Sequence, residues 1–197
     1  MRIAICGLGL IGGSLAKAYK FNTDYTVYGA DADEVTFKRA VLVNALDGRL
    51  TEETIGDCDY IFLGVKPQML KSLFEKIAPV LEDRTTDFVL VSMAAGVSMA
   101  TISAMAGVDC PIIRIMPNMP VAVGEGMILY TSNEFVSMED IEGFLDAMKY
   151  AGVLDKIDED KIDAASCVSG CGPAFAFMFC EALADGAVEC GLPRDKA

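Results

Sequence analysis

Three glycines near the start of the chain have the types and spacing that suggest a chemical role. The pattern Gly7-x-Gly9-x-x-Gly12 stands between a β-branched run, residues 3–6, and an alanine-rich stretch, residues 15–19. Between a strand and a helix, such glycines permit a tight turn, close approach of a pyrophosphate and close helix–strand packing. Backbone N–H groups at the helix N-terminus then face the phosphates. We therefore predict that this loop binds a dinucleotide through Gly7, Leu8, Gly9, Leu10, Ile11 and Gly12.

An aspartate follows the next apolar run at the distance that a dinucleotide site requires. Asp31 stands 19 residues after Gly12 and ends the run at residues 25–30. A carboxylate there is expected to accept hydrogen bonds from the adenine ribose, whereas a 2′-phosphate would meet a like charge. The nearest arginine that follows is Arg39, so Asp31 taken alone favours NAD over NADP. The alternative is a purely structural strand–turn–helix with an incidental surface aspartate.

The elements that must position these residues alternate along the chain. We expect an α/β protein with a Rossmann-type, doubly wound and mostly parallel sheet, because apolar strand runs alternate with amphipathic helical stretches. The predicted strands are residues 3–6, 26–28, 60–65, 88–92, 112–115, 127–130 and 153–156, and the predicted helices are residues 13–19, 35–43, 69–81, 99–106 and 138–150.

The composition changes near residue 155, where a charged segment, residues 155–163, begins. We expect a dinucleotide-binding domain over residues 1–157 and the start of an all-helical domain over residues 158–197. Pro173 suits the first turn of a helix, and the apolar stretch that follows carries only one narrow polar stripe. We therefore expect self-association, as a dimer or higher oligomer, through residues 173–190. The last residues resemble the start of another helix, so we also expect the chain to be truncated.

The overall composition excludes several classes of function. The net charge is −13, with no long basic run, and we find no apolar stretch that approaches the length of a membrane span, about 18 residues. Nucleic acid and membranes are therefore not expected partners. Seven cysteines without a metal-type spacing, and the absence of histidine, favour buried thiols in a reducing cytoplasm and no metal site.

Further unusual residues follow the ends of three predicted strands, where open α/β sheets bind ligands. Small residues at 94–96 would let a flat ring lie close to the backbone, and Lys66 is a candidate contact to cofactor or substrate. Asn118, between two prolines, is a candidate hydrogen-bonding partner for the nicotinamide side of a cofactor. Purely structural roles remain the alternative for both polar residues.

At these loops the chain resembles the pyrroline-5-carboxylate reductase family. The resemblance covers nearly the whole chain and is carried by Val-Lys-Pro at 65–67, Ala-Ala-Gly at 94–96, Arg-x-Met-Pro-Asn-x-Pro at 114–120, Asp-Ala-Ala-Ser-x-x-Ser-Gly-Cys-Gly-Pro-Ala-Phe at 163–175, Ala-Leu-Ala-Asp-Gly at 182–186 and Gly-Leu-Pro-Arg at 191–194. The glycine loop differs from the family pattern and is more similar to that of prephenate dehydrogenase.

The resemblance implies a reaction and its site. It implies hydride transfer from NADPH or NADH to the C=N carbon of 1-pyrroline-5-carboxylate, giving proline. It implies a cofactor groove lined by Gly64, Val65, Lys66, Pro67, Met93, Ala94 and Ala95, with Glu159 near the active site. It also implies an active site formed between subunits, with a substrate loop after residue 197. We therefore expect residues 1–197 alone to bind the cofactor and to reduce little substrate.

Two other functions stay open from the sequence. One is a prephenate- or hydroxyacid-type NAD(P) dehydrogenase that uses the same N-terminal domain; residues 170–173 argue against it. The other is a dinucleotide-binding module without catalytic activity, for which binding of NAD(P)H without turnover would be the sign.

Overall fold

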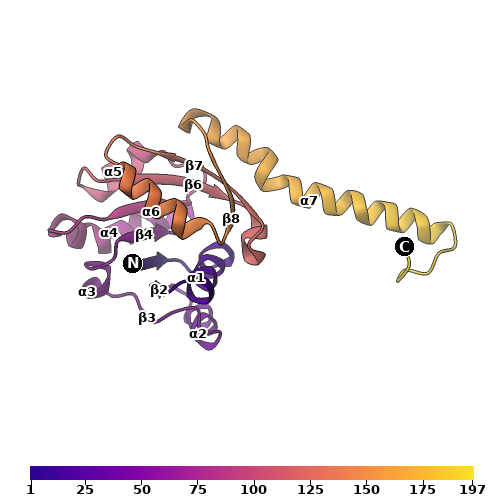
Figure 1. Ribbon diagram of the computed structural model, residues 1–197, viewed down its shortest axis with the longest axis horizontal. Helices are drawn as coiled ribbons and strands as arrows, with labels where there is room; N and C mark the ends of the chain where they lie inside the picture. Colours follow the sequence, from indigo (N-terminus) through magenta and orange to yellow (C-terminus); the bar gives the residue numbers. More distant parts are fainter.

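An eight-stranded sheet covered by helices on both faces forms the body of the protein, and one long helix projects from it (Figure 1). The computed structural model describes residues 1–197. The strand order is β3-β2-β1-β4-β5-β6-β7-β8, and every neighbouring pair is parallel except β6–β7. The predicted doubly wound α/β fold is therefore confirmed.

The bounds of the elements follow the sequence pattern closely. The strands are β1 (Arg2–Cys6), β2 (Thr26–Ala30), β3 (Gly48–Arg49), β4 (Tyr60–Leu63), β5 (Val89–Ser92), β6 (Ile112–Pro117), β7 (Gly126–Ser132) and β8 (Gly152–Lys156). The helices are α1 (Leu10–Asn22), α2 (Glu34–Leu42), α3 (Glu52–Ile55), α4 (Leu70–Glu82), α5 (Met99–Ala106), α6 (Met138–Met148) and α7 (Glu159–Glu189), with short 3-10 helices η1 (Pro67–Met69) and η2 (Met119–Val123).

The two faces of the sheet bury separate apolar clusters. In β1, Ile3 and Ile5 pack into one cluster together with residues of α1, α2 and α6. Ala4 and Cys6 point to the opposite face, where residues of α3, α4 and α5 form the second cluster. Because helices cover both faces of the sheet, the β1 side chains on either face are buried, which explains why residues 3–6 are all apolar. The carboxyl ends of β1, β2 and β4 meet at one edge.

One short strand and one short helix are additions to the sequence-based assignment. β3 has two residues, too few for any alternation of polar and apolar side chains, and pairs with the outer edge of β2. α3 is a single turn. Its start does carry a signal, because Thr51 and Thr54 form a reciprocal capping box. α3 and the two residues between it and β3, Leu50 and Thr51, line the cleft described below.

The long helix α7 corrects the prediction that a helix begins at Pro173. α7 begins at Glu159 and continues through Pro173 to Glu189. A proline inside a helix removes one backbone donor, here the N–H that would bond the carbonyl of Ser169. Asn118 supplies that donor from outside the helix, with Nδ2 2.8 Å from the Ser169 oxygen. The tertiary contact therefore allows a helix that local sequence preferences would end.

α7 also corrects two expectations from composition. It contains an 18-residue window with mean hydropathy 1.5, so by length and composition alone it is apolar enough to cross a membrane. Because glycine and serine residues interrupt the apolar residues of this helix, the sequence shows no continuous apolar run of that length. Four of the seven cysteines, which we expected to be buried, are exposed on or just after α7, namely Cys167, Cys171, Cys180 and Cys190.

Candidate functional site

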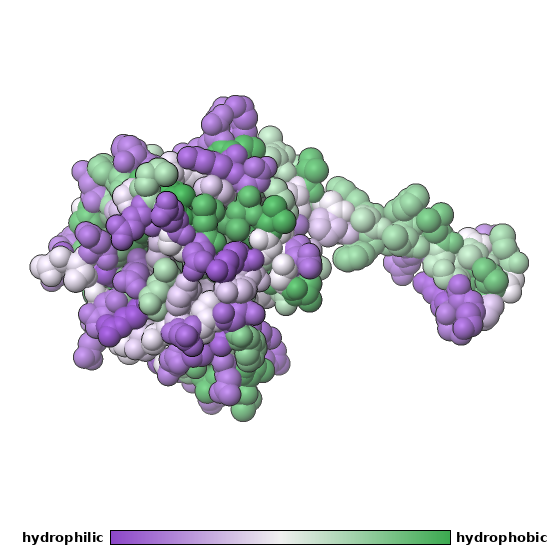
Figure 2. All heavy atoms as spheres, viewed as in Figure 1, coloured by the Kyte–Doolittle hydropathy of each residue, from purple (hydrophilic) through white to green (hydrophobic).

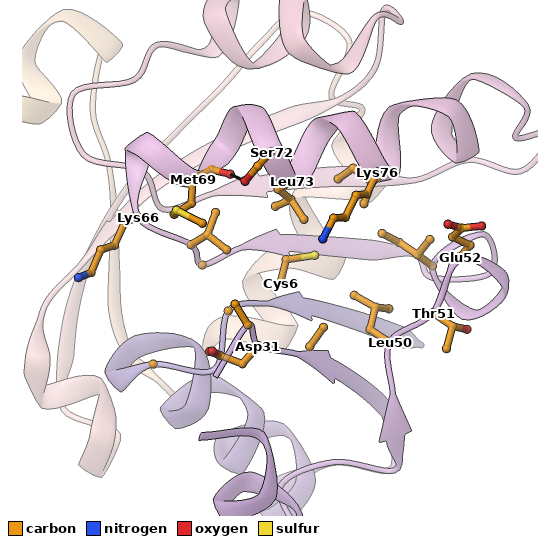
Figure 3. A pocket seen from close by; sticks show the side chains of 18 residues that line it. Cys6, Asp31, Leu50, Thr51, Glu52, Lys66, Met69, Ser72, Leu73 and Lys76 are labelled. Atoms are coloured by element: carbon orange, nitrogen blue, oxygen red, sulfur yellow. Dashed lines mark hydrogen bonds between the residues drawn. The ribbon is translucent and has the colours of Figure 1, made fainter. Parts of the chain in front are cut away.

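A cleft of about 600 Å³ opens at the carboxyl ends of β1, β2 and β4 and contains the residues with the clearest chemical pattern (Figure 3). α3 and the segment before it form one wall, and α4 forms another. Of the predicted cofactor-binding residues, those that line the cleft are Gly7, Gly9, Asp31, Gly64, Val65 and Lys66. The edge of the sheet at which open α/β proteins bind ligands is thus hollow and carries the predicted loop.

The glycine loop is packed so tightly that two of its positions tolerate no side chain. Gly7 has a φ of +102°, and a Cβ there would lie 2.6 Å from the carbonyl oxygen of Gly64. A Cβ on Gly12 would collide with the carbonyl oxygen of Gly7. Gly64 is restricted in turn, because its Cβ would lie 2.9 Å from that same oxygen. These glycines bring the loops after β1 and β4 into direct contact.

Gly9 differs from its neighbours because it faces open space. A Cβ on Gly9 would meet no atom within 4 Å, and its backbone at φ −63° is accessible to any residue. α1 begins immediately after it with neither a side-chain cap nor an acidic residue in its first turn. By contrast, side chains cap the N-termini of α2, α3, α5 and α6. The uncapped N–H groups and open space fit the pyrophosphate of a dinucleotide.

Asp31 directly follows β2, and its carboxylate contacts the glycine loop after β1. Its Oδ2 accepts a hydrogen bond from the Leu8 N–H at 2.8 Å, and its Oδ1 accepts one from the Asp33 N–H at 2.8 Å. The carboxylate is therefore held at the mouth of the cleft by backbone donors on both sides, which is the position predicted for a ribose-binding acid.

Cys6 is a residue of the cleft that the sequence did not single out. It ends β1, and its side chain lies among the lining residues beneath α4 in Figure 3. Burial, with the neighbouring Cys58 adding to it, raises the pKa of the Cys6 thiol to about 12. Since the thiolate is the nucleophilic form, Cys6 acts at neutral pH as part of the apolar floor and not as a nucleophile.

Two lysines of the cleft point in different directions. Lys76 extends from α4 into the cleft, whereas the Lys66 side chain points away from the other labelled residues (Figure 3). The sequence predicted the buried apolar face of α4 from its periodicity. It did not indicate that Ser72 and Lys76, beside that face, line the cleft. Other lining residues that the sequence did not suggest are Ala30, Ala32, Leu50, Thr51, Glu52, Ile55, Met69, Leu73 and Ile77.

The remaining predicted groove residues stand beside the cleft and not in its lining. Leu10 and Ile11 form the first turn of α1, and Pro67 begins η1. Met93 follows β5, and its side-chain methyl group lies next to Gly64. The other predicted groove residues outside the lining of the cleft are Leu8, Gly12, Ala94 and Ala95. Their roles toward a cofactor stay predictions.

Asn118 and Glu159 both join the body to α7 and lie outside the cleft. Asn118 uses both parts of its amide, donating to the Ser169 carbonyl and accepting from the Met127 N–H at 2.8 Å. Glu159 Oε1 accepts from the Met99 N–H at 2.7 Å and so caps the first turn of α5. These bonds favour a positioning role for the two residues over the predicted contact with cofactor or substrate.

Arg114 is the buried cation that ties α7 to the sheet. It is 3% exposed on β6, and Nη2 lies 2.6 Å from an Asp163 carboxylate oxygen. Nη1 lies 3.4 Å from Glu159 Oε1. A buried guanidinium requires such partners because an unpaired charge is strongly destabilising in the interior. The arginine of the 114–120 motif thus has an evident structural function in this chain.

Comparison with known proteins assigns this arrangement to a family. A family profile described as "Pyrroline-5-carboxylate reductase dimerisation" matches residues 159–197, and one described as "NADP oxidoreductase coenzyme F420-dependent" matches residues 2–96. The chain is 32% identical to "Pyrroline-5-carboxylate reductase" of Corynebacterium melassecola over 99% of its own length and 73% of that protein. It belongs to the pyrroline-5-carboxylate reductase family.

Other family members agree over nearly the whole chain. The Bos taurus "Pyrroline-5-carboxylate reductase 2" is 38% identical over 98% of this chain, which spans 62% of that protein. The crystal structure of Plasmodium falciparum pyrroline carboxylate reductase with NADP bound superposes with a TM-score of 0.80 at 30% identity, over 99% of this chain and 72% of that one. Family membership disfavours the dehydrogenase alternative.

Proposed function

We propose that the protein reduces 1-pyrroline-5-carboxylate to proline with a nicotinamide dinucleotide as the electron donor. The observation that carries this proposal is the cleft at residues 7–12, with its open Gly9 and uncapped helix, in a chain of the reductase family. The reduced nicotinamide, when bound, supplies a hydride to the C=N carbon, and the protonated ring nitrogen becomes the amine. Membership of the reductase family supports a reaction of this class, in which the enzyme acts on a CH–NH group.

The residues of this chain would bind and orient rather than exchange protons. The α1 N-terminus holds the phosphates, and Asp31 orients the ribose through hydrogen bonds to its hydroxyl groups. A protonated cyclic imine accepts a hydride without further activation, so the absence of histidine is no obstacle. The expected contributions of this chain are placement of the donor and exclusion of water.

The test is steady-state reduction of 1-pyrroline-5-carboxylate by the full-length protein, followed by loss of reduced nicotinamide absorbance and by proline formation. We expect one proline for each dinucleotide oxidised. Prephenate and 2-hydroxy acids with the oxidised dinucleotide are expected to give no turnover. Dinucleotide binding without proline formation would support the non-catalytic module instead and contradict the proposal.

We further propose that NADH is preferred over NADPH, because the end of β2 is acidic and Arg49, on the neighbouring strand β3, is already paired. Asp31 faces the cleft, and Asp33 and Glu34 follow it. Arg49 donates to both oxygens of Glu34 at 2.9 Å and covers the Phe37 ring. A 2′-phosphate at this position would meet these carboxylates.

Replacing Asp31 by asparagine is expected to shift the cofactor preference toward NADPH. The ratio of kcat/KM for NADH to that for NADPH should fall by about 10- to 100-fold, since the like charge is removed while an acceptor for the Leu8 N–H remains. Asp24→Asn, at an exposed loop on the far end of β2, changes the net charge equally and should leave the ratio unchanged. Strong NADPH preference in the unmodified protein would contradict this assignment.

We propose that the protein self-associates through α7, as a dimer or higher oligomer. Supporting this proposal, the half of α7 beyond Ser169 projects from the body with large apolar side chains in solvent (Figures 1 and 2). Phe175, Phe179 and Leu183, at helical spacing of four residues, are each more than 60% exposed. Patches of this kind mark association surfaces.

Seven cysteines without a disulfide support a cytoplasmic location.

A further inference from the structure

Pro173 creates a specific defect in the middle of α7. Because proline has no N–H, the carbonyl of Ser169, four residues earlier, loses its helical partner. Ser169 is half-buried against the body, where water cannot fully replace that bond. An unpaired buried carbonyl costs free energy comparable to a lost hydrogen bond. The helix therefore needs a donor from another element at this point.

Asn118 is that donor, and it is held in place from the other side. It follows β6, is 7% exposed, and places Nδ2 2.8 Å from the Ser169 oxygen. Its Oδ1 accepts the Met127 N–H at 2.8 Å, which locks the amide orientation to the start of β7. The two prolines that flank the turn, Pro117 and Pro120, restrict the backbone around it.

This contact lies where α7 leaves the body. Before it, α7 is tied down by Arg114, which pairs with Glu159 and Asp163. After it, from residue 170 onward, the helix runs free of the body (Figure 1), and its large apolar side chains are exposed (Figure 2). Asn118 and Pro173 thus sit at the point that sets the direction of the projecting half of α7.

We propose that Asn118 and Pro173 act as a matched pair: the asparagine replaces the helical donor that the proline removes, and this bond positions the projecting half of α7 relative to the cofactor cleft. Asn118 is a positioning residue and touches neither substrate nor cofactor. The consequence for catalysis rests on the proposed reductase activity, because it assumes that the helical domain completes the active site. The contact itself does not depend on that activity.

A double-mutant cycle in the full-length protein tests the pairing. Asn118→Ala should lower Tm by about 3 to 8 °C, as expected for a buried carbonyl and a buried N–H that both lose their partner. Pro173→Ala supplies a backbone N–H four residues after Ser169. In that background the loss caused by Asn118→Ala should be about half as large, because the helix now satisfies the carbonyl itself.

Asn133 provides the matched control. It also bridges two backbone groups, accepting from the Ile112 N–H and donating to the Cys110 carbonyl, both at 2.9 Å, at the end of β7 opposite to the Asn118 contact. Asn133→Ala should lower Tm by the same amount with and without the Pro173→Ala substitution. Equal losses for Asn118→Ala in the two backgrounds would overturn the proposed pairing.

Kinetics separate positioning from general loss of stability. At a temperature well below Tm, Asn118→Ala should lower kcat by about 10- to 100-fold, because a displacement near 1 Å at a remote support has effects of this size. The dissociation constant of the reduced dinucleotide should change less than about 2-fold. An unchanged kcat would overturn the positioning role. If the unmodified protein does not reduce the imine, the proposed function fails, while the Tm cycle still decides the pairing.

Discussion

Replacing Gly9 with alanine is expected to leave the protein folded and to weaken dinucleotide binding by about 100-fold or more. The Cβ would meet no protein atom within 4 Å, and the φ of −63° suits alanine. The added methyl group would stand where a pyrophosphate must approach the backbone at the start of α1. Loss of several phosphate hydrogen bonds corresponds to about 3 kcal/mol, which is about 100-fold in affinity. Fluorescence titration with NADH and thermal unfolding measure the two effects.

Gly12→Ala is the matched comparison, because the same methyl group has an opposite consequence there. At Gly12 the Cβ collides with the Gly7 carbonyl oxygen, so the loop or α1 must shift. We expect a lower Tm for Gly12→Ala and an unchanged Tm for Gly9→Ala. Tight NADH binding by the Gly9→Ala protein would show that the dinucleotide does not approach this loop.

The second large effect is expected from a charge on the exposed apolar stripe of α7. Phe179→Asp should weaken self-association by about 100- to 1,000-fold, because aromatic anchors at interface centres contribute about 2 to 4 kcal/mol each. The protein should then elute as a monomer at micromolar concentration. If the active site forms between subunits, as the family resemblance implies, kcat should fall with the loss of the oligomer. Analytical ultracentrifugation and proline formation measure the two quantities.

Phe21→Asp is the control for this substitution. Phe21 at the end of α1 is 66% exposed, the same fraction as Phe179, and it lies on the body instead of the projecting helix. It should change neither the sedimentation of the protein nor its activity. An oligomer that survives Phe179→Asp unchanged would contradict assembly through this face of α7.

Much of the binding cleft follows from short-range sequence rules. Gly7, Gly12 and Gly64 stand where backbone segments touch, and no other residue type fits these contacts. Asp31 could be placed because the spacing from glycine loop to second strand is set by one helix and one strand. The walls formed by residues 50–51 after β3, by α3 and by the polar side of α4 were not predictable. A two-residue strand and a one-turn helix carry too little periodicity to be recognised.

Asn118 shows why the rest required the tertiary structure. Its type and its place between two prolines suggested a ligand contact, yet its amide bonds Met127 and Ser169, 9 and 51 residues away. Glu159 likewise caps α5, 60 residues before it in the chain. No local sequence pattern predicts these hydrogen bonds, because they depend on which distant elements the strand order of the sheet brings together.

By itself, the sequence determined that the chain forms a doubly wound sheet with a dinucleotide loop at its carboxyl edge. Those features depend on residue type at short spacing, through glycine sterics, apolar periodicity and an acid at the end of β2. The tertiary structure alone decided that α7 passes through Pro173 and leaves the body at Ser169. The physical reason is that a proline inside a helix leaves one carbonyl without its helical donor, and here Asn118 provides a donor from outside the helix.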